Sequence, residues 1–284
     1  MARRACDIVC HARGNPFPSP VVSTARPLDG KVAVITGGNQ GIGRAIAQAM
    51  ADAGASLGLC ARSEESVQSA ANELRAGGVD CLAVRCDVSD PASTDAMSEA
   101  VLKHFGKVDV VVANAGIAGA IRPMHEITYE EWRECIGIDL DGVYLTFRRF
   151  IPGMISAGGG SLIALSSMTG KRPLPERTPY GAAKMGVIGL VRSLALELGP
   201  HKIRVNSVCP GPVAGPRLNR IVKQQAATLG ISEADSMRMF SDASALKRPV
   251  DATEVAAACV FLASDAGSGM TGEDMNVSAG VVMY

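Results

Sequence analysis

Tyr180, Lys184 and Ser167 are the side chains whose types and spacing could do chemistry. On a helix, Tyr180 and Lys184 would lie on one face, about one turn apart. A phenol ordinarily loses its proton at about pH 10, and a neighbouring ammonium favours the phenolate. The tyrosine could then exchange a proton with a carbonyl or alcohol whose oxygen Ser167 holds. An isolated pair at this spacing is more often a surface contact than a site.

A glycine-rich segment near the start of the chain is the second group with a chemical role. Residues 36–43 read Thr-Gly-Gly-Asn-Gln-Gly-Ile-Gly, between a short apolar run and a helical pattern. Strand, glycine turn and helix together let backbone amides and a helix N-terminus receive a phosphate. Gly37 would make the tight turn, Gly41 would let the backbone approach a pyrophosphate, and Gly43 would let helix and strand pack closely. An ordinary glycine-rich loop is the alternative.

Both motifs, together with Asn114-Ala115-Gly116 and Pro210-Gly211, resemble the short-chain dehydrogenase/reductase family. Order and spacing agree from about residue 29 to the C-terminus. The resemblance implies a single-domain, Rossmann-like α/β fold with a doubly wound parallel sheet in three layers. It also implies a nicotinamide cofactor and hydride transfer between that cofactor and a carbonyl or alcohol.

The resemblance also assigns roles to individual residues. Ser167 matches the family serine, because it stands three residues before Gly170, and Ser166 is left as a turn or capping group. Val213 would offer its backbone amide to the carboxamide of the cofactor. The residues expected to bind the cofactor are Gly37, Asn39, Gln40, Gly41, Ile42, Gly43, Arg62, Asp87, Val88, Asn114, Ala115, Gly116, Tyr180, Lys184, Pro210, Gly211 and Val213.

Asp139 is a departure from the family pattern, since it occupies the position of the active-site asparagine, whose backbone carbonyl supports a proton relay. Asp139 keeps that carbonyl and is expected to join Ser167, Tyr180 and Lys184 in catalysis. Its carboxylate adds a negative charge near Lys184, which would weaken the pull of the lysine on Tyr180. The alternative is that Asp139 points to solvent or caps a helix.

The residues at the end of the second expected strand indicate which nicotinamide cofactor the chain prefers. Ala61 stands where NAD-preferring relatives carry an acid, and Arg62 follows it. An arginine can bind a phosphate bidentately, so we expect NADP(H), with NAD(H) as the alternative. Asp87 matches the family aspartate that binds adenine, and it could instead or also cap the helix that starts near Pro91.

Composition is that of an ordinary globular enzyme. Twenty-eight basic residues balance 28 acidic ones, which argues against nucleic acid or an anionic membrane as the main partner. No apolar run reaches the roughly 18 residues that a spanning helix needs. The eight cysteines are scattered, which favours a reducing, cytoplasmic location. Cys6, Cys10 and His11 lack a fourth ligand nearby, so no metal is expected.

Strand-like runs and helical patterns alternate along the chain. Such alternation predicts βαβ units and a parallel sheet covered on both faces. The strands are expected at 32–36, 56–61, 81–86, 108–113, 161–166, 203–208 and 273–277. The helices are expected at 41–53, 64–76, 92–106, 129–156, 179–198 and 252–263.

Outside these elements, residues 1–28 are rich in arginine and proline and are expected to be a disordered extension or a transit segment. Residues 29–284 would form the catalytic domain, with a substrate lid near 212–249. Apolar residues on more than one face of the helices at 129–156 and 179–198 favour a homotetramer or dimer.

The expected activity is NADP(H)-dependent interconversion of a small carbonyl compound and a secondary alcohol. Reduction of a 3-oxoacyl group on an acyl carrier protein is one alternative. Such a carrier is acidic and would need a basic patch, which Arg122, Lys171, Arg172 and Arg177 could supply. A cofactor-binding sensor or scaffold with little turnover is an alternative of another class.

Overall fold

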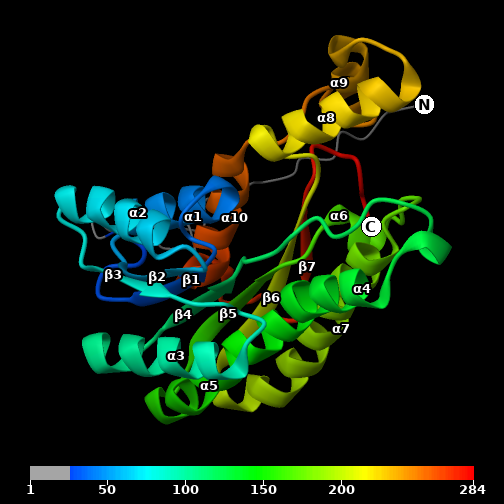
Figure 1. The fold of residues 1–284 in the computed structure, drawn as a ribbon. Helices are drawn as coiled ribbons and strands as arrows, with labels where there is room; N and C mark the ends of the chain where they lie inside the picture. The colour runs from blue at the N-terminus through cyan, green and yellow to red at the C-terminus, as the bar shows by residue number, and fades with distance from the viewer. Residues whose placement is uncertain (1–25) are drawn as a thin grey trace, which may run out of the picture.

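The computed structural model describes residues 26–284, and their centre is one seven-stranded sheet (Figure 1). All neighbouring strands are parallel, in the order β3-β2-β1-β4-β5-β6-β7. The strands are β1 (Val32–Thr36), β2 (Ser56–Ala61), β3 (Cys81–Arg85), β4 (Val110–Ala113), β5 (Gly160–Leu165), β6 (Ile203–Pro210) and β7 (Asp274–Val277).

Helices cover both faces of this sheet. In Figure 1, α1, α2 and α10 lie on one side, and α3, α5 and α7 lie on the other. The helices are α1 (Gly41–Asp52), α2 (Glu64–Ala76), α3 (Pro91–Phe105), α4 (Tyr129–Ile136), α5 (Gly142–Ala157), α6 (Met168–Lys171), α7 (Thr178–Leu198), α8 (Pro216–Leu229), α9 (Glu233–Asp242) and α10 (Ala252–Ala263).

Two apolar clusters, one on each face, explain this three-layer arrangement. Side chains alternate between the faces of a strand, so Ala33 and Ile35 of β1 enter one cluster, and Val32 and Val34 enter the other. A strand buried on both faces reads as a continuous apolar run, as 32–35 does. The predicted doubly wound parallel sheet is confirmed.

The sheet order reverses between β1 and β4, since β2 and β3 continue on one side of β1 and β5 to β7 on the other side of β4. Loops that leave the carboxyl ends of these two strands diverge to opposite faces, which leaves a crevice where ligands of open α/β sheets bind. The glycine turn follows β1, and Asn114 follows β4. The predicted site residues therefore begin at the switch point.

The helix expected at 129–156 is interrupted in the structure. Between α4 and α5, residues Gly137–Asp141 form a π-helical segment. Each backbone bond of a π segment closes one residue later than in an α-helix, so the side chains that follow turn to a new face. The prediction of one regular helix was wrong here, and Asp139 lies within the interruption.

The 212–249 segment contains two helices that were not expected from the sequence, α8 and α9, and these lie away from the sheet in Figure 1. Its two ends meet in a parallel bridge between Val213 and Val250. The amide of Ala214 donates to the carbonyl of Val250 at 2.8 Å, and the amide of Val250 donates to that of Pro212 at 2.8 Å. The segment thus leaves and rejoins the body at one place.

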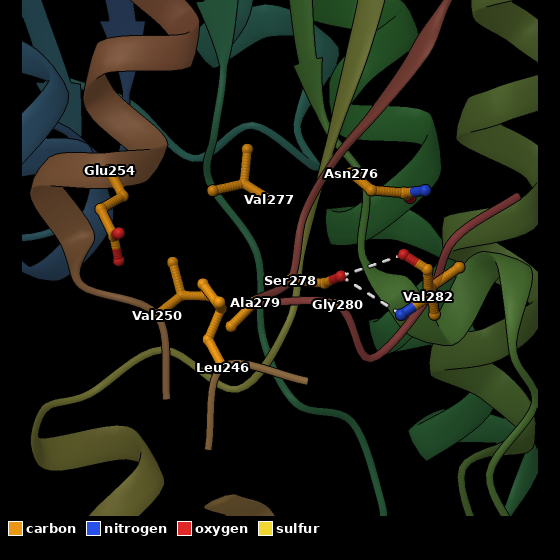
Figure 2. A pocket seen from close by; sticks show the side chains of 9 residues that line it. All are labelled: Leu246, Val250, Glu254, Asn276, Val277, Ser278, Ala279, Gly280 and Val282. Carbon is orange, nitrogen blue, oxygen red and sulfur yellow. Dashed lines mark hydrogen bonds between the residues drawn. The ribbon is translucent and has the colours of Figure 1, made fainter. Parts of the chain in front are cut away.

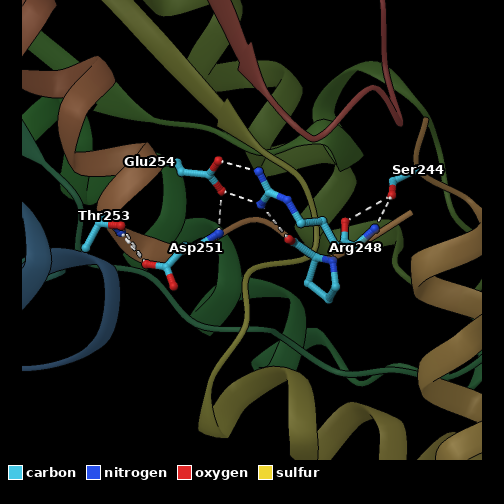
Figure 3. Close-up of polar contacts among 6 residues, drawn as sticks. Ser244, Arg248, Asp251, Thr253 and Glu254 are labelled. Atoms are coloured by element: carbon cyan, nitrogen blue, oxygen red, sulfur yellow. Dashed lines mark hydrogen bonds and ion pairs between the residues drawn. The ribbon is translucent and has the colours of Figure 1, made fainter. Parts of the chain in front are cut away.

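Polar contacts fasten the returning end to α10 (Figure 3). The guanidinium of Arg248 donates to both carboxylate oxygens of Glu254, each at 2.7 Å. Glu254 also accepts from the amide of Asp251, whose own side chain caps α10, so the pair forms a capping box. These hydrogen bonds, that of Arg248 first, lower the pKa of Glu254 to about 2.

The first residues that the structure describes already pack against the body of the domain. Leu28, which the sequence analysis assigned to the N-terminal extension, is fully buried, and its amide donates to the carbonyl of Ala53 at 2.8 Å. Cys6, Cys10 and His11 lie outside the described residues.

Candidate active site

The glycine turn between β1 and α1 has the backbone that the sequence predicts. Gly37 and Gly41 have positive φ values of 65° and 55°, a region that suits glycine. A Cβ on Gly43 would lie 2.1 Å from the carbonyl oxygen of Gly37, so only glycine fits where the helix meets the turn. Gln40 provides no side-chain cap for α1. The first amides of this helix therefore remain available to an anion.

Asn114 ties the end of β4 to the glycine turn. Its side-chain amide donates to the carbonyl of Thr36 at 2.8 Å and to that of Gly37 at 3.3 Å. In return, the hydroxyl of Thr36 accepts from the amides of Asn114 and Ala115, each at 3.0 Å. Asn114 was expected to lie beside a cofactor. The structure adds that the side chain of Asn114 fixes the glycine turn, which is the loop expected to hold that cofactor.

Arg62 and Asp87 lie on the loops after β2 and β3. Arg62 is exposed, and within residues 26–284 it has no ion pair. The hydroxyl of Ser89 donates to Asp87 and is the largest cause that lowers the pKa of this carboxyl, to which Arg62 also contributes. Asp90 caps α3 by accepting from the amide of Ala92 at 3.0 Å, so the suggestion that Asp87 caps this helix was wrong.

Lys184 and Tyr180 lie together on α7, and both are buried. The ammonium of Lys184 is 5.6 Å from the centre of the Tyr180 ring, and it donates to the carbonyl of Leu165 at 2.9 Å. Leu165 ends β5, two residues before Ser167. The lysine therefore holds the face of α7 that carries Tyr180 against the strand end that carries Ser167.

Of the two serines after β5, Ser166 has a role that differs from the one expected, and Ser167 has an additional contact. Ser166 donates to the carbonyl of Lys184 at 2.8 Å and is buried, so it fastens α7 to the sheet rather than making a turn or cap. Ser167 caps the short helix α6 by accepting from the amide of Thr169 at 3.1 Å. Because its oxygen accepts that bond, its hydroxyl hydrogen remains free to donate to another group.

Asp139 is fully buried beside Lys184, and the alternative that it points to solvent was wrong. One oxygen lies 3.2 Å from the lysine ammonium and accepts from the amide of Ile117 at 3.1 Å. The other accepts from the thiol of Cys135 at 3.5 Å. Burial, and then the charge of Asp139, raise the pKa of this thiol to about 12.

Gly116 leaves room for this ion pair. A Cβ at Gly116 would lie 2.3 Å from the carboxylate of Asp139 and 3.4 Å from the ammonium of Lys184. The glycine of the Asn-Ala-Gly motif therefore has a packing reason in this chain, because a side chain there would displace the buried carboxylate.

Two arginines near Tyr180 were missed as members of the site. The guanidinium carbon of Arg177 lies 4.7 Å from the centre of the Tyr180 ring, and that of Arg217 lies 5.8 Å from it. Arg177 precedes α7 and Arg217 lies in the first turn of α8. The sequence carries no local signal for either contact, because Arg177 precedes the helix and Arg217 belongs to a different helix.

The loop after β6 completes this end of the sheet. The amide of Gly211 donates to the carbonyl of Val277 at 2.9 Å, and a Cβ on Gly211 would lie 2.8 Å from the Cα of Ser278. The Val213–Val250 bridge uses the carbonyl of Pro212 and the amide of Ala214, so the amide of Val213 points away from it. That amide is free to meet a ligand from the other side.

A cavity of about 200 Å³ lies at the base of the 212–249 segment (Figure 2). It is lined by Leu246, Val250 and Glu254 on one side, and on the other by the end of β7 and the residues after it, namely Asn276, Val277, Ser278, Ala279, Gly280 and Val282. None of the predicted site residues lines it, so this cavity is distinct from the place where Tyr180 and Lys184 meet.

The residues present fit a nicotinamide dinucleotide. The uncapped N-terminus of α1 and the glycine turn suit a pyrophosphate, and Asn39 donates to Ser66 at 2.9 Å at the border of that turn. Gln40, Val88 and Ala115 lie on loops at the carboxyl ends of the strands, Ile42 lies in the first turn of α1, and Pro210 ends β6.

Within residues 26–284, no three His, Cys, Asp or Glu side chains gather as a metal site requires. None of the helices in the same part of the chain combines the length and the apolar character that a membrane span requires.

Comparisons with known proteins agree with this geometry. Residues 37–282 match a family model described as "Enoyl-(Acyl carrier protein) reductase". The short chain dehydrogenase/reductase astE of Aspergillus oryzae is 36% identical over 256 residues, which cover 89% of this chain and 95% of that protein. The cis-4-hydroxycyclohexanecarboxylate dehydrogenase of Sinomonas cyclohexanicum is 37% identical over 250 residues, covering 88% and 96%.

Two solved structures share the fold over nearly the whole described chain. Actinorhodin polyketide ketoreductase with NADPH has a TM-score of 0.86 and 31% identity, covering 89% of this chain and 98% of that chain. NAD+-bound xylitol dehydrogenase has a TM-score of 0.85 and 27% identity, covering 89% and 99%. The chain therefore belongs to the short-chain dehydrogenase/reductase family of NAD(P)-dependent oxidoreductases.

Proposed function

We propose that the chain transfers a hydride between NADP(H) and a small ketone or secondary alcohol, with Tyr180 as proton donor or acceptor. The observation that carries this proposal is the buried ammonium of Lys184, 5.6 Å from the Tyr180 ring and held by the carbonyl of Leu165. A charge in a site with little water acts on its neighbours more strongly than it would in bulk water. Tyr180 then serves as general acid in reduction and as general base in oxidation.

The residues around Tyr180 have complementary tasks. Bound nicotinamide supplies the hydride in reduction and accepts it in oxidation. The hydroxyls of Ser167 and Tyr180 donate to the substrate oxygen and stabilise the negative charge that develops on it. An ammonium has three N–H donors, and Leu165 and Asp139 engage two of those of Lys184. The third remains for a ribose hydroxyl or for the oxygen of Tyr180.

Preference for NADP(H) over NAD(H) rests on Arg62. Its side chain is exposed at the end of β2, with Ala61 in place of an acid that would repel a phosphate. A guanidinium there can bind the 2′-phosphate of the adenosine ribose bidentately. Asp87, on the next loop, is the proposed partner of the adenine.

The first experiment follows the absorbance of reduced nicotinamide with NADPH and NADH side by side, using cyclohexanone and acetoacetyl thioester as substrates. Faster oxidation of NADPH supports the proposal for Arg62, and faster oxidation of NADH contradicts it. Loss of reduced nicotinamide with either substrate supports oxidoreductase activity. If no ketone or secondary alcohol is turned over with either cofactor, the proposed function is wrong.

Reduction of a 3-oxoacyl thioester is the second candidate, and the similarity to a polyketide ketoreductase supports it. An acidic carrier protein would need a basic patch beside the cleft. Arg122 and Lys171 are held in ion pairs, and Arg177 faces Tyr180, so of the four predicted residues Arg172 alone is exposed and unpaired within residues 26–284. This arrangement favours a small free substrate over a carrier-bound one.

A sensor or scaffold that binds the cofactor without turnover is the candidate of another class, and the Asp139 carboxylate beside Lys184 is the feature in its favour. Tight nucleotide binding without turnover of any ketone or alcohol would support it.

We further propose a cytoplasmic homotetramer or dimer in which the 212–249 segment closes over the substrate. Tyr144 on α5 and Met185 and Leu196 on α7 are large apolar side chains that remain exposed, as a subunit interface requires. Sedimentation of the purified chain tests the assembly: a monomer at micromolar concentration contradicts it.

A further inference from the structure

Two guanidinium groups converge on Tyr180 from separate parts of the chain. Arg177 comes from the loop before α7, and its guanidinium carbon lies 4.7 Å from the centre of the Tyr180 ring. Arg217 comes from α8 in the 212–249 segment, 5.8 Å from the same centre. Together with Lys184, they surround the phenol with three cationic side chains.

Within residues 26–284, neither arginine is in an ion pair. By contrast, Arg122, whose amide donates to the carbonyl of Glu176 beside Arg177, is paired with Glu131. The Nε of Arg177 is buried and has no hydrogen-bond partner. A buried donor without a partner is unfavourable, which is why such groups are normally satisfied.

The charges around Arg177 also favour a bound anion. Burial is the main cause that lowers the pKa of Arg177. Tyr180 raises this pKa, the charge of Arg217 lowers it further, and Cys135 and Asp139 raise it by less. Asp139 is not the partner of Arg177, because no ion pair or hydrogen bond joins them within the described residues, while Lys184, the amide of Ile117 and the thiol of Cys135 contact the two oxygens of Asp139. An anion between the two guanidinium groups would relieve their repulsion and satisfy the free donor.

We infer that Arg177 and Arg217 bind a carboxylate of the substrate, so that the chain acts on oxo acids or hydroxy acids. This inference rests on the proposed function and names its substrate class. Guanidinium groups match the two oxygens of a carboxylate. The pyrophosphate of the cofactor belongs at the other end of the site, beside the uncapped N-terminus of α1.

Because the two arginines lie on different elements, a bound carboxylate joins the 212–249 segment to the body. The substrate anion thereby holds the segment over Tyr180, while the remaining carbon skeleton carries the carbonyl towards Ser167. Small neutral ketones lack this connection and should bind more weakly than the acids of matching shape.

The test is calorimetric titration of the full chain saturated with NADP+, using cyclohexanecarboxylate, benzoate and hexanoate, each beside its primary amide. We expect at least one acid to bind about ten- to a hundredfold more tightly than its amide, as charge-assisted hydrogen bonds allow. Arg177→Gln and Arg217→Gln should each remove most of that difference. Arg220→Gln is the matched control, since Arg220 is exposed on α8, one turn beyond Arg217.

Three outcomes overturn the inference. No acid binds more tightly than its amide, or both arginine variants keep the difference in affinity between acid and amide. The third outcome is that both variants weaken the binding of NADP+ as much as they weaken the binding of the acid. Because Arg177 is partly buried, the exposed Arg217 provides a variant whose folding is not at stake. Measuring the turnover of neutral ketones distinguishes a failure of this inference from a failure of the proposed function. If cyclohexanone is reduced but no acid is preferred, the inference alone fails; if acids bind and no carbonyl is ever reduced, the proposed function fails.

Discussion

The ammonium of Lys184 lies 3.2 Å from the carboxylate of Asp139, and both side chains are buried. Since the π-helical segment turns Asp139 inwards, the position that the family fills with a neutral asparagine carries a charge in this chain. The lysine is consequently shared between Asp139, the carbonyl of Leu165 and whatever lies over Tyr180.

Replacement of Asp139 tests how much of that arrangement depends on charge. Asp139→Asn keeps an acceptor for the amide of Ile117 and should reduce the free energy of unfolding by about 1–3 kcal/mol. Asp139→Ala leaves the Lys184 charge buried without its partner and should cost about 3–5 kcal/mol. We expect the asparagine variant to retain turnover and the alanine variant to lose more than about tenfold of it, as Lys184 loses its position.

Urea unfolding and steady-state rates, measured on the same preparations, check this prediction. Asp141→Asn is the control, because Asp141 belongs to the same segment but is half exposed, and it should change stability by less than about 0.5 kcal/mol. Equal losses for the asparagine and alanine variants would contradict this prediction, because they would assign the whole effect to the charge that both variants lack and none to the acceptor that asparagine keeps.

Tyr180→Phe removes the proton donor and keeps the ring that Arg177 covers. Turnover should fall by about a hundred- to ten-thousandfold, the usual contribution of a general acid or base, while the dissociation constant for NADP+ stays unchanged. Tyr129→Phe, at an exposed tyrosine on α4, should have no effect. Stopped-flow rates and fluorescence titration measure both quantities, and wild-type turnover in Tyr180→Phe would remove this residue from the mechanism.

Arg62→Ala should reduce the preference for NADPH over NADH. Loss of a charge-assisted contact to the 2′-phosphate predicts about a ten- to a hundredfold fall in kcat/KM with NADPH and little change with NADH. Lys103→Ala removes one positive charge from an exposed position on α3 and serves as control. An unchanged ratio between the two cofactors in Arg62→Ala would assign the choice of cofactor to other residues.

Glu254 links stability to pH at the base of the 212–249 segment. The hydrogen bonds of Arg248 and Asp251 lower its pKa to about 2 from an ordinary value of 4.5. A lowered carboxyl pKa means that the stabilisation is complete above pH 4.5 and is lost as the pH falls through about 2.

The corresponding measurement compares the Tm of the wild type and Glu254→Gln at pH 7 and at pH 3. The variant should melt at a lower temperature at pH 7, and the gap should narrow at pH 3. High salt should also narrow the gap, because the Arg248–Glu254 pair is exposed. A gap that widens on acidification would contradict this account.

The sheet and the motif residues were predictable because their signals are local. The central strands are short apolar runs, as β1 is, although β7 reads Asp-Met-Asn-Val. The glycines at 37 and 41 are required by their positive φ values, and Gly43 is required by its close contact with the turn. Helices α8 and α9 were missed, although Leu218, Val222 and Ala226 recur every four residues and are buried on one face of α8. That pattern was available in the sequence.

Other features of the site depend on tertiary contacts that no local pattern records. The π-helical segment has no signature in composition, so the inward direction of Asp139 could not be read from the chain. Nor could the burial of Arg177, since a surface arginine and one facing a cleft look alike in sequence. The role of Ser166 in binding the carbonyl of Lys184 required the packing of α7 on β5.

Because the two ends of the 212–249 segment are paired, we expect that the segment can be replaced as a unit. Val213 and Val250 lie side by side, so the sheet does not depend on the length or sequence of what is inserted between them. Loop closure costs little when the ends already meet, and insertions of this kind are tolerated. From the proposed role of this stretch over the substrate, we expect substrate range to follow it when it is grafted, Arg217 included, between relatives.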